Sequence, residues 1–219
     1  FIYLDPVSLS NSSDNILYFY YDETQDDNST YVGVTGSTPA QSVWPSAAKM
    51  VQHMADDPSG GADCMIDSTS NGNHMTPYGS MVAGDLVDGQ AGGKALRFDG
   101  LAQYLGRTGL SSIAGDITAI SFAKISDISA TKGIVSQYDA GVNSGWLMTA
   151  NSAGNVSFAG RSGGTYVTSG ASSGVYDDNN YHLFVGRRDS LVWKIFIDAG
   201  ADASSGTGYT GDIGNAALL

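Results

Sequence analysis

Aromatic and hydrogen-bonding side chains gather in the middle of the chain, between residues 138 and 166. Rings of Tyr and Trp stack on the apolar faces of sugars, and polar side chains bind sugar hydroxyls. The sequence therefore predicts a ligand-binding surface of this kind, formed by Tyr138, Asp139, Asn143, Trp146, Arg161 and Tyr166. Burial is the alternative for Trp146, and even more so for Trp193, because a Trp in a strand is usually buried.

A second group of oxygen-bearing side chains lies in the segment DSTSNGN at residues 67–73. Asp67, Asn71 and Asn73 fall within this one short turn, and Ca²⁺ prefers several hard oxygen ligands of this kind. The alternative is an Asx turn, in which the side chains bond nearby backbone N–H groups and hold no metal. The spacing differs from that of an EF-hand loop, which needs Gly at the sixth position and Glu at the twelfth.

The residue patterns of several common catalytic and redox sites are missing from this chain. Cys64 is the only cysteine, so an intrachain disulfide is excluded, and the apolar residues after it predict a small buried side chain. No spacing of Cys and His fits zinc. No Gly-x-Ser-x-Gly motif points to a Ser-His-Asp triad.

The charge distribution excludes two classes of partner. The net charge is −12, with ten Lys and Arg against 22 Asp and Glu. Nucleic acids and anionic membrane surfaces are both bound through clustered Lys and Arg. No apolar stretch approaches the roughly 20 residues of a membrane-spanning helix. We therefore predict neither nucleic-acid binding nor membrane insertion.

Composition and residue pattern both favour short strands joined by tight turns. Gly is abundant at 29 residues, charged residues make up only 15%, and every acidic residue except Glu23 is Asp, a turn former. Several stretches are rich in β-branched and aromatic residues or alternate apolar with polar residues, as strands do. These predicted strands lie at residues 95–98, 103–105, 117–125, 133–138, 145–150, 155–159, 165–169, 180–188 and 191–198.

Four segments, in order along the chain, carry a resemblance to a known family. They are the DSTSNGN turn at 67–73, the GGKALRFDG stretch at 92–100, the Tyr181-His182 pair and the FID triplet at 196–198. With these motifs the chain resembles the laminin-G-like or concanavalin A-like jelly-roll domains. The resemblance implies a first strand at 49–54. It also implies that His53 and His182 are packed strand residues that bond the backbone.

The fold that the resemblance implies is all-β, a two-sheet antiparallel β-sandwich of the concanavalin A-like jelly-roll type that lacks its final strand. Residues 46–219 would form this C-terminally truncated domain. Residues 1–45 would be the end of a small β domain of unassigned function, often found upstream, plus a connector. The implied hairpin brings Asp99 near the DSTSNGN turn as a fourth candidate calcium ligand. A missing strand would leave a sheet edge open to self-association.

The family is mostly a scaffold for binding and adhesion, and a fold does not name its ligand. The resemblance implies a non-catalytic, lectin-like module of a larger extracellular, cell-surface or virion protein, which binds a glycan or a cell-surface or virion protein. A structural or assembly domain of a surface layer or phage tail is the alternative. A carbohydrate-active hydrolase or lyase is less well supported, because the family's hydrolases use two Glu on one strand and Glu23 is the only Glu here.

Overall fold

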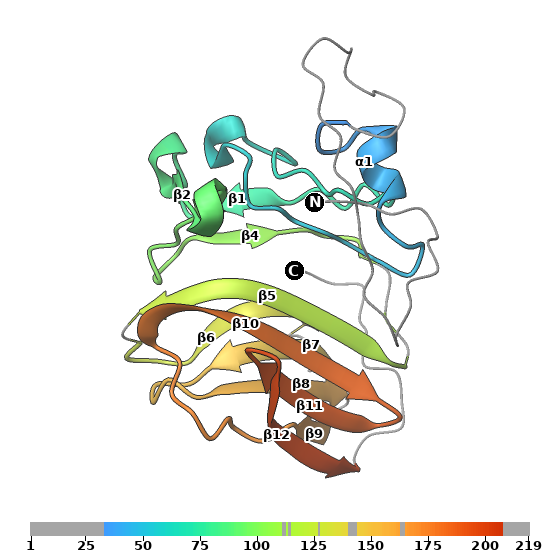
Figure 1. The fold of residues 1–219 in the computed structure, drawn as a ribbon, viewed down its shortest axis with the longest axis vertical. Helices are drawn as coiled ribbons and strands as arrows, with labels where there is room; N and C mark the ends of the chain where they lie inside the picture. Colours follow the sequence, from blue (N-terminus) through green and yellow to red (C-terminus); the bar gives the residue numbers. More distant parts are fainter. Residues whose placement is uncertain are drawn as a thin grey trace, which may run out of the picture. The chain divides into compact units, whose positions relative to one another are not determined.

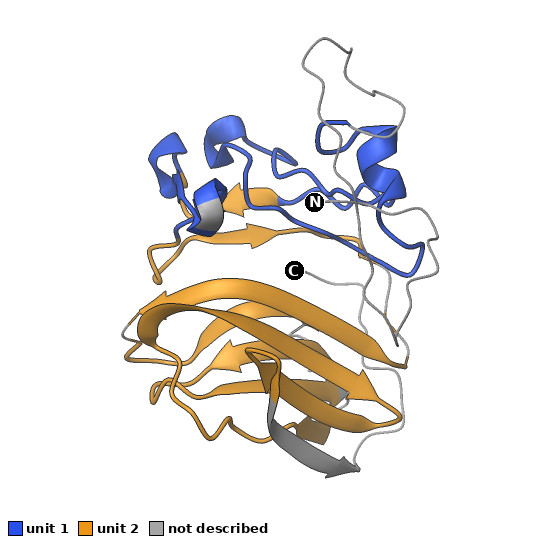
Figure 2. Ribbon diagram, in the orientation of Figure 1, with its two compact units in different colours: residues 1–75, 82–97 blue, residues 76–81, 98–219 orange. Residues whose placement is uncertain are grey.

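The structure, a computed structural model, describes residues 33–110, 113, 115–126, 128–139, 144–162 and 165–207. The chain forms two compact units (Figure 2): the first comprises residues 1–75 and 82–97, and the second comprises residues 76–81 and 98–219. The boundary predicted between residues 45 and 46 falls inside the first unit, and residues 1–32 lie outside the described residues. The predicted N-terminal β domain stays a prediction.

The first unit consists mostly of loops with short regular elements. These are helix α1 (Thr38–Ser42), the 3₁₀ turns Pro58–Gly60, Ala83–Asp85 and Gln90–Gly92, and a hairpin of β2 (Leu86–Asp88) with β3 (Lys94–Leu96). The strand expected at residues 49–54 is wrong, because within it only Gln52 forms a bridge, to Asp67. A side chain, and not a neighbouring strand, provides a hydrogen bond to this stretch, since the Val51 N–H donates to the Asp67 carboxylate at 2.9 Å.

The second unit contains three antiparallel sheets (Figure 1). In the smallest, β1 (Thr76–Tyr78) pairs with β4 (Tyr104–Gly106). The sheet of order β12-β11-β10-β5 contains β5 (Ile117–Ser126), β10 (Asp178–Asp189), β11 (Val192–Ile197) and β12 (Gly200–Thr207). The sheet of order β6-β7-β8-β9 contains β6 (Lys132–Asp139), β7 (Ser144–Ala150), β8 (Val156–Ser162) and β9 (Thr165–Thr168).

The two four-stranded sheets pack against each other through an apolar core. Alternate residues of β11 point inward, so Trp193, Ile195 and Ile197 are all buried. Phe158 on β8 contacts Trp193 with ring centroids 5.1 Å apart. Gly160, the next inward residue of β8, is needed for this close approach, because a Cβ there would lie 2.2 Å from the Trp193 ring. Burial of each such large apolar side chain contributes about 1.5–3 kcal/mol.

The prediction of a mostly β chain is confirmed, since the described residues form several small antiparallel sheets with almost no helix. Each predicted strand from residue 95 onward is present, with ends that differ by at most three residues. The described strands do not show a closed jelly-roll sandwich, so that finer prediction stays a prediction. Strand β12 was not predicted, because its sequence GADASSGT carries few strand-favouring residues. No helix in the described ranges is long and apolar enough to span a membrane.

Candidate functional site

Strand register aligns three of the six residues predicted to bind a ligand. Tyr138 on β6 is the partner of Gly145 on β7, which is also the partner of Arg161 on β8. Arg161 is in turn the partner of Tyr166 on β9. Cross-strand partners project from the same face of a sheet. Tyr138, Gly145, Arg161 and Tyr166, which we call the outer row, therefore cross the whole sheet on one face.

The outer row lies on the face opposite the core. Its neighbours in sequence, Gln137 and Trp146, pair with each other and are both buried. Trp146 is 6% exposed, contacts Phe158 in the core and donates its Nε1–H to the Gln137 Oε1 at 3.2 Å. Of the two interpretations of Trp146, burial is therefore the correct one, and its place among the ligand residues is wrong. Trp146 directly follows Gly145, and successive residues of a strand face opposite sides.

Arg161 reaches across the row to Tyr138. Its Nη1–H donates to the Tyr138 hydroxyl at 3.3 Å, and the register places Gly145 between them. Only Gly fits at residue 145, because φ is +127° and a Cβ would lie 2.0 Å from the Gln137 carbonyl oxygen. Tyr166, on the strand at the end of this sheet, is 52% exposed. The row thus combines a guanidinium with two phenol rings, which together can stack on a sugar ring and donate to its hydroxyls.

Two more of the predicted ligand residues are Asp139 and Asn143. Asp139 is the last residue of β6, and its backbone pairs with Ser144. The side chain of Asp139 and the whole of Asn143 lie outside the described residues. Their part in the site stays a prediction.

The predicted calcium loop is held together by its own hydrogen bonds. Asp67 is fully buried, and its Oδ1 accepts from the N–H groups of Val51 and Thr69, both at 2.9 Å. Its Oδ2 accepts from the Thr69 hydroxyl at 2.8 Å and from the Asn73 N–H at 2.9 Å. An ionised carboxylate offers about four lone-pair sites. The protein itself therefore occupies the acceptor capacity that Asp67 would offer to a cation.

The other candidate calcium ligands also bond the backbone. The Nδ2 groups of Asn71 and Asn73 both donate to the Lys49 carbonyl, at 3.3 and 2.8 Å. Asp99 belongs to the second unit, and backbone N–H groups, that of Leu101 foremost, hold the pKa of its carboxyl below the usual range. Across the described ranges, no three His, Cys, Asp or Glu side chains gather in a way that could hold a metal ion. The calcium site stays a prediction.

A pocket of about 260 Å³ adjoins Asp99 in the second unit. Phe98 and Leu101 contribute its apolar side, and Asp99 and Lys132 contribute its charged groups. Both charged groups bond the loop itself, since Lys132 donates to the Gly100 carbonyl and Asp99 accepts the backbone N–H groups that follow it. The pocket therefore presents fewer unengaged donors to a ligand than the outer row does.

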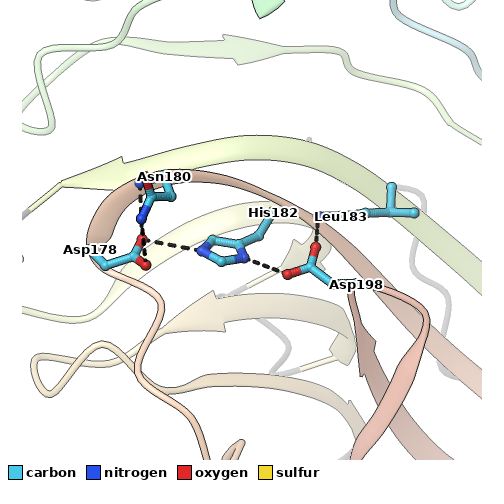
Figure 3. Close-up of polar contacts among 5 residues, drawn as sticks. All are labelled: Asp178, Asn180, His182, Leu183 and Asp198. Atoms are coloured by element: carbon cyan, nitrogen blue, oxygen red, sulfur yellow. Dashed lines mark hydrogen bonds and ion pairs between the residues drawn. The ribbon is translucent and has the colours of Figure 1, made fainter.

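A histidine with two acidic partners lies on the other four-stranded sheet (Figure 3). The Nδ1 of His182 is 2.7 Å from the Asp198 Oδ2, and its Nε2 is 3.1 Å from the Asp178 Oδ1. The other oxygen of Asp198 accepts the Leu183 N–H at 3.0 Å. The prediction that His182 bonds the backbone is therefore wrong. Its partners are two carboxylates, and its side chain is only 14% exposed.

These contacts shift the pKa values of all three groups. Burial alone would lower the pKa of His182, but the hydrogen bonds to Asp198 and Asp178 outweigh it and raise the pKa. Hydrogen bonds from Asn180, helped by His182, lower the pKa of Asp178 to about 2. The bond from His182 is the main cause that lowers the pKa of Asp198. Because carboxylates engage both ring nitrogens, the cluster links the start of β10 to the turn after β11 and leaves no nitrogen to activate a nucleophile.

Two features of the structure were not predicted from the sequence. The hairpin predicted over residues 180–198 brings Asp198 close to His182, so the strand pattern contained a signal for this pair. The second feature is a stacked pair of exposed rings, Tyr78 and Tyr104, with centroids 4.8 Å apart on β1 and β4. Strand β1 contains a Pro and is only three residues long, which is too short for a pattern to reveal it.

No protein-family model matches the chain, and no curated protein is significantly similar to it in sequence. Among solved structures, the binding domain of Paraclostridial Mosquitocidal Protein 1 is 14% identical over 71% of this chain and 41% of that chain, with a TM-score of 0.45. The carbohydrate binding module CBM66 from Bacillus subtilis is 18% identical over 61% of this chain and 86% of that chain, with a TM-score of 0.37.

An S-layer domain-containing protein from Clostridium thermocellum is 18% identical over 75% of this chain and 71% of that chain, with a TM-score of 0.40. These are distant likenesses to β-rich domains, namely a toxin binding domain, a carbohydrate binding module and an S-layer domain. All three TM-scores lie below 0.5.

Proposed function

We propose that this chain is a non-catalytic binding module that holds a saccharide on the outer row. The observation that carries the proposal is the alignment of Tyr138, Arg161 and Tyr166 on the face of a four-stranded sheet opposite the core. Residue types alone predicted these three as ligand residues. The register then gives them a common surface, as a flat ligand would require.

The chemistry of the row suits recognition better than bond cleavage. Phenol rings stack on the apolar face of a sugar, and a guanidinium donates to its oxygens. Hydrolysis of a glycosidic bond would need two carboxylates about 5–10 Å apart on either side of that bond. The two Tyr and one Arg of the row supply no carboxylate, and the only Glu of the chain, Glu23, lies outside the described residues. We accordingly place the chain in a larger extracellular, cell-surface or virion protein as a binding part.

A glycan array probed with the whole chain, followed by titration with the best ligand, tests this function. Tyr166→Ala should weaken binding about tenfold, because a stacked ring contributes about 0.5–1.5 kcal/mol beyond its buried area. Tyr104→Ala is the matched control, since Tyr104 is a tyrosine of equal exposure, 52%, on a different sheet. Unchanged affinity of Tyr166→Ala, or an equal loss for both variants, would exclude the outer row as the binding surface.

A structural role through self-association is the second candidate. Among the described strands, β5 lies at the edge of its sheet, and it carries the exposed apolar residues Ile120 and Phe122. Long edge strands with exposed apolar side chains favour pairing with another chain. Sedimentation of the whole chain over a range of concentrations tests this role. Dimerisation that Phe122→Lys abolishes would favour it, and a monomer at all concentrations would remove it.

A further inference from the structure

We propose that the saccharide bound by the outer row carries an anionic group, a carboxylate or a sulfate, and that Arg161 binds this group. The inference rests on the function proposed above and narrows the ligand from saccharides in general to acidic saccharides. It follows from the few contacts that the protein itself makes with the Arg161 guanidinium.

Arg161 differs from Arg187 and Arg188 in its partner. Arg187 bonds the Asp189 carboxylate at 2.7 Å. Arg188 is buried and donates to a backbone carbonyl. Arg161 instead bonds the neutral hydroxyl of Tyr138, and no carboxylate among the described side chains lies within ion-pair distance of it. Among the described side chains, none therefore neutralises its positive charge.

The guanidinium also has donors to spare. It carries five N–H donors, and the 3.3 Å bond to Tyr138 uses one of them. The Nε is shielded from water and has no hydrogen-bond partner. Charged donors without an acceptor are costly when removed from water. An anion would accept from the Nη donors that the bond to Tyr138 leaves over, and a carboxylate or similar oxyanion can take two parallel hydrogen bonds from a guanidinium.

The surroundings of Arg161 suit an acidic sugar in particular. Gly145 has no side chain, so the Arg161 guanidinium can reach across β7 to the Tyr138 hydroxyl on this face. Tyr166 flanks Arg161 on the other side and is exposed. A sugar ring could therefore lie against a phenol ring while its anionic group contacts the guanidinium. An inorganic anion alone would leave both rings unused.

The overall negative charge of the chain is not spread evenly. The second unit, which contains the outer row, has seven Lys and Arg against ten Asp, a net charge of −3. The first unit has three Lys and Arg against twelve Asp and Glu, a net charge of −9. Exposed charges are largely screened beyond about 8 Å at physiological ionic strength. The immediate neighbours of Arg161 therefore decide whether an anion binds there, rather than the total of −12.

Calorimetric titration of the whole chain with two pairs of probes tests the inference. Oligogalacturonate supplies carboxylates, and its fully methyl-esterified form supplies the same sugars without charge. Dextran sulfate and dextran form the corresponding pair for sulfate. We expect at least one charged probe to bind about tenfold more tightly than its neutral counterpart, and high salt to reduce that difference. The charged probe that binds identifies the anionic group.

Three variants test whether the preference for the charged probe depends on Arg161. Arg161→Gln should abolish the preference for the charged probe, and Arg161→Lys should retain part of it, because an ammonium keeps the charge without the fork. Arg187→Gln is the matched control, since Arg187 is an exposed arginine on the other four-stranded sheet that already has a carboxylate partner. Thermal melting of each variant verifies that it folds.

The outcomes separate this inference from the function on which it rests. Equal binding of neutral and charged probes, with Arg161→Gln unaffected, would overturn the acidic-saccharide inference and leave saccharide binding intact. A preference for the charged probe that survives in Arg161→Gln would also overturn it, because the anion would then bind elsewhere. If no probe binds and the glycan array is empty as well, both proposals are wrong.

Discussion

Asp67 offers a sharp test of how the first unit is held together. Asp67→Asn should lower the free energy of unfolding by about 2–6 kcal/mol. The side chain is fully buried and its two oxygens accept four hydrogen bonds. An amide keeps one oxygen for the N–H groups of Val51 and Thr69, but places an NH₂ group opposite the Asn73 N–H and the Thr69 hydroxyl. Each buried donor left without an acceptor costs about 1–3 kcal/mol, and two are affected.

Hydrogen exchange measured by mass spectrometry can locate this loss as well as detect it. The amides of Val51, Thr69 and Asn73 should exchange faster in Asp67→Asn, and the thermal midpoint should fall. The matched control is Asp88→Asn, an exposed Asp of the same unit whose carboxylate bonds Lys94, and it should leave the stability close to that of the wild type. Wild-type exchange of the three amides in Asp67→Asn would show that the carboxylate does not organise the loop.

Three further predictions concern calcium, His182 and Gly160. Hydrogen bonds occupy both Asp67 oxygens, so we expect the same melting midpoint in about 1 mM Ca²⁺ as in a chelator. A midpoint several degrees higher in Ca²⁺ would instead establish the calcium site. His182→Asn should destabilise the protein more near pH 5 than near pH 9. The pKa of His182 is raised on folding, so its stabilisation is complete below the unfolded value of about 6.5 and is lost as the pH rises through the folded pKa. Melting curves of both proteins across this pH range check the sign, and an equal difference at all pH values would contradict it. Gly160→Ala should cost about 1–3 kcal/mol in urea unfolding, since the added methyl meets the Trp193 ring, and a neutral result would mean that the core is loosely packed there.

The strands were predictable where burial alternates along them. In β11 every second residue faces the core, and the apolar pattern of residues 191–198 reports this directly. Strand β12 shows no such pattern, because GADASSGT is made mostly of small and polar residues. It forms a strand because β11 offers it a ladder, in which Ile195 pairs with Ala203. Tertiary pairing of this kind lies beyond any local propensity.

The sequence predicts which residue types form the candidate sites better than it predicts which of those residues contact one another. The chemistry of Tyr138, Arg161 and Tyr166 suits sugars and is visible in the sequence. Their alignment depends on three strand registers that the sequence does not show. The carboxylates around His182 lie 4 and 16 residues away, on either side of it in the sequence. Local reasoning treats both as turn residues. For Asp67 the sequence allows an Asx turn or a calcium ligand, and it does not show the four hydrogen bonds that the carboxylate accepts.

The register of the sheet β6-β7-β8-β9 specifies the core and the outer row together. Gly145 and Trp146 are adjacent on β7, one facing outward and the other inward. A slip of one residue would turn Trp146 out to solvent and Arg161 towards the apolar core. Neither is tolerable, because an exposed Trp146 loses its contacts with Phe158 and a buried unpaired guanidinium is strongly destabilising. The packing that stabilises the second unit therefore also holds Tyr138, Arg161 and Tyr166 in line, so the proposed binding surface does not depend on any loop.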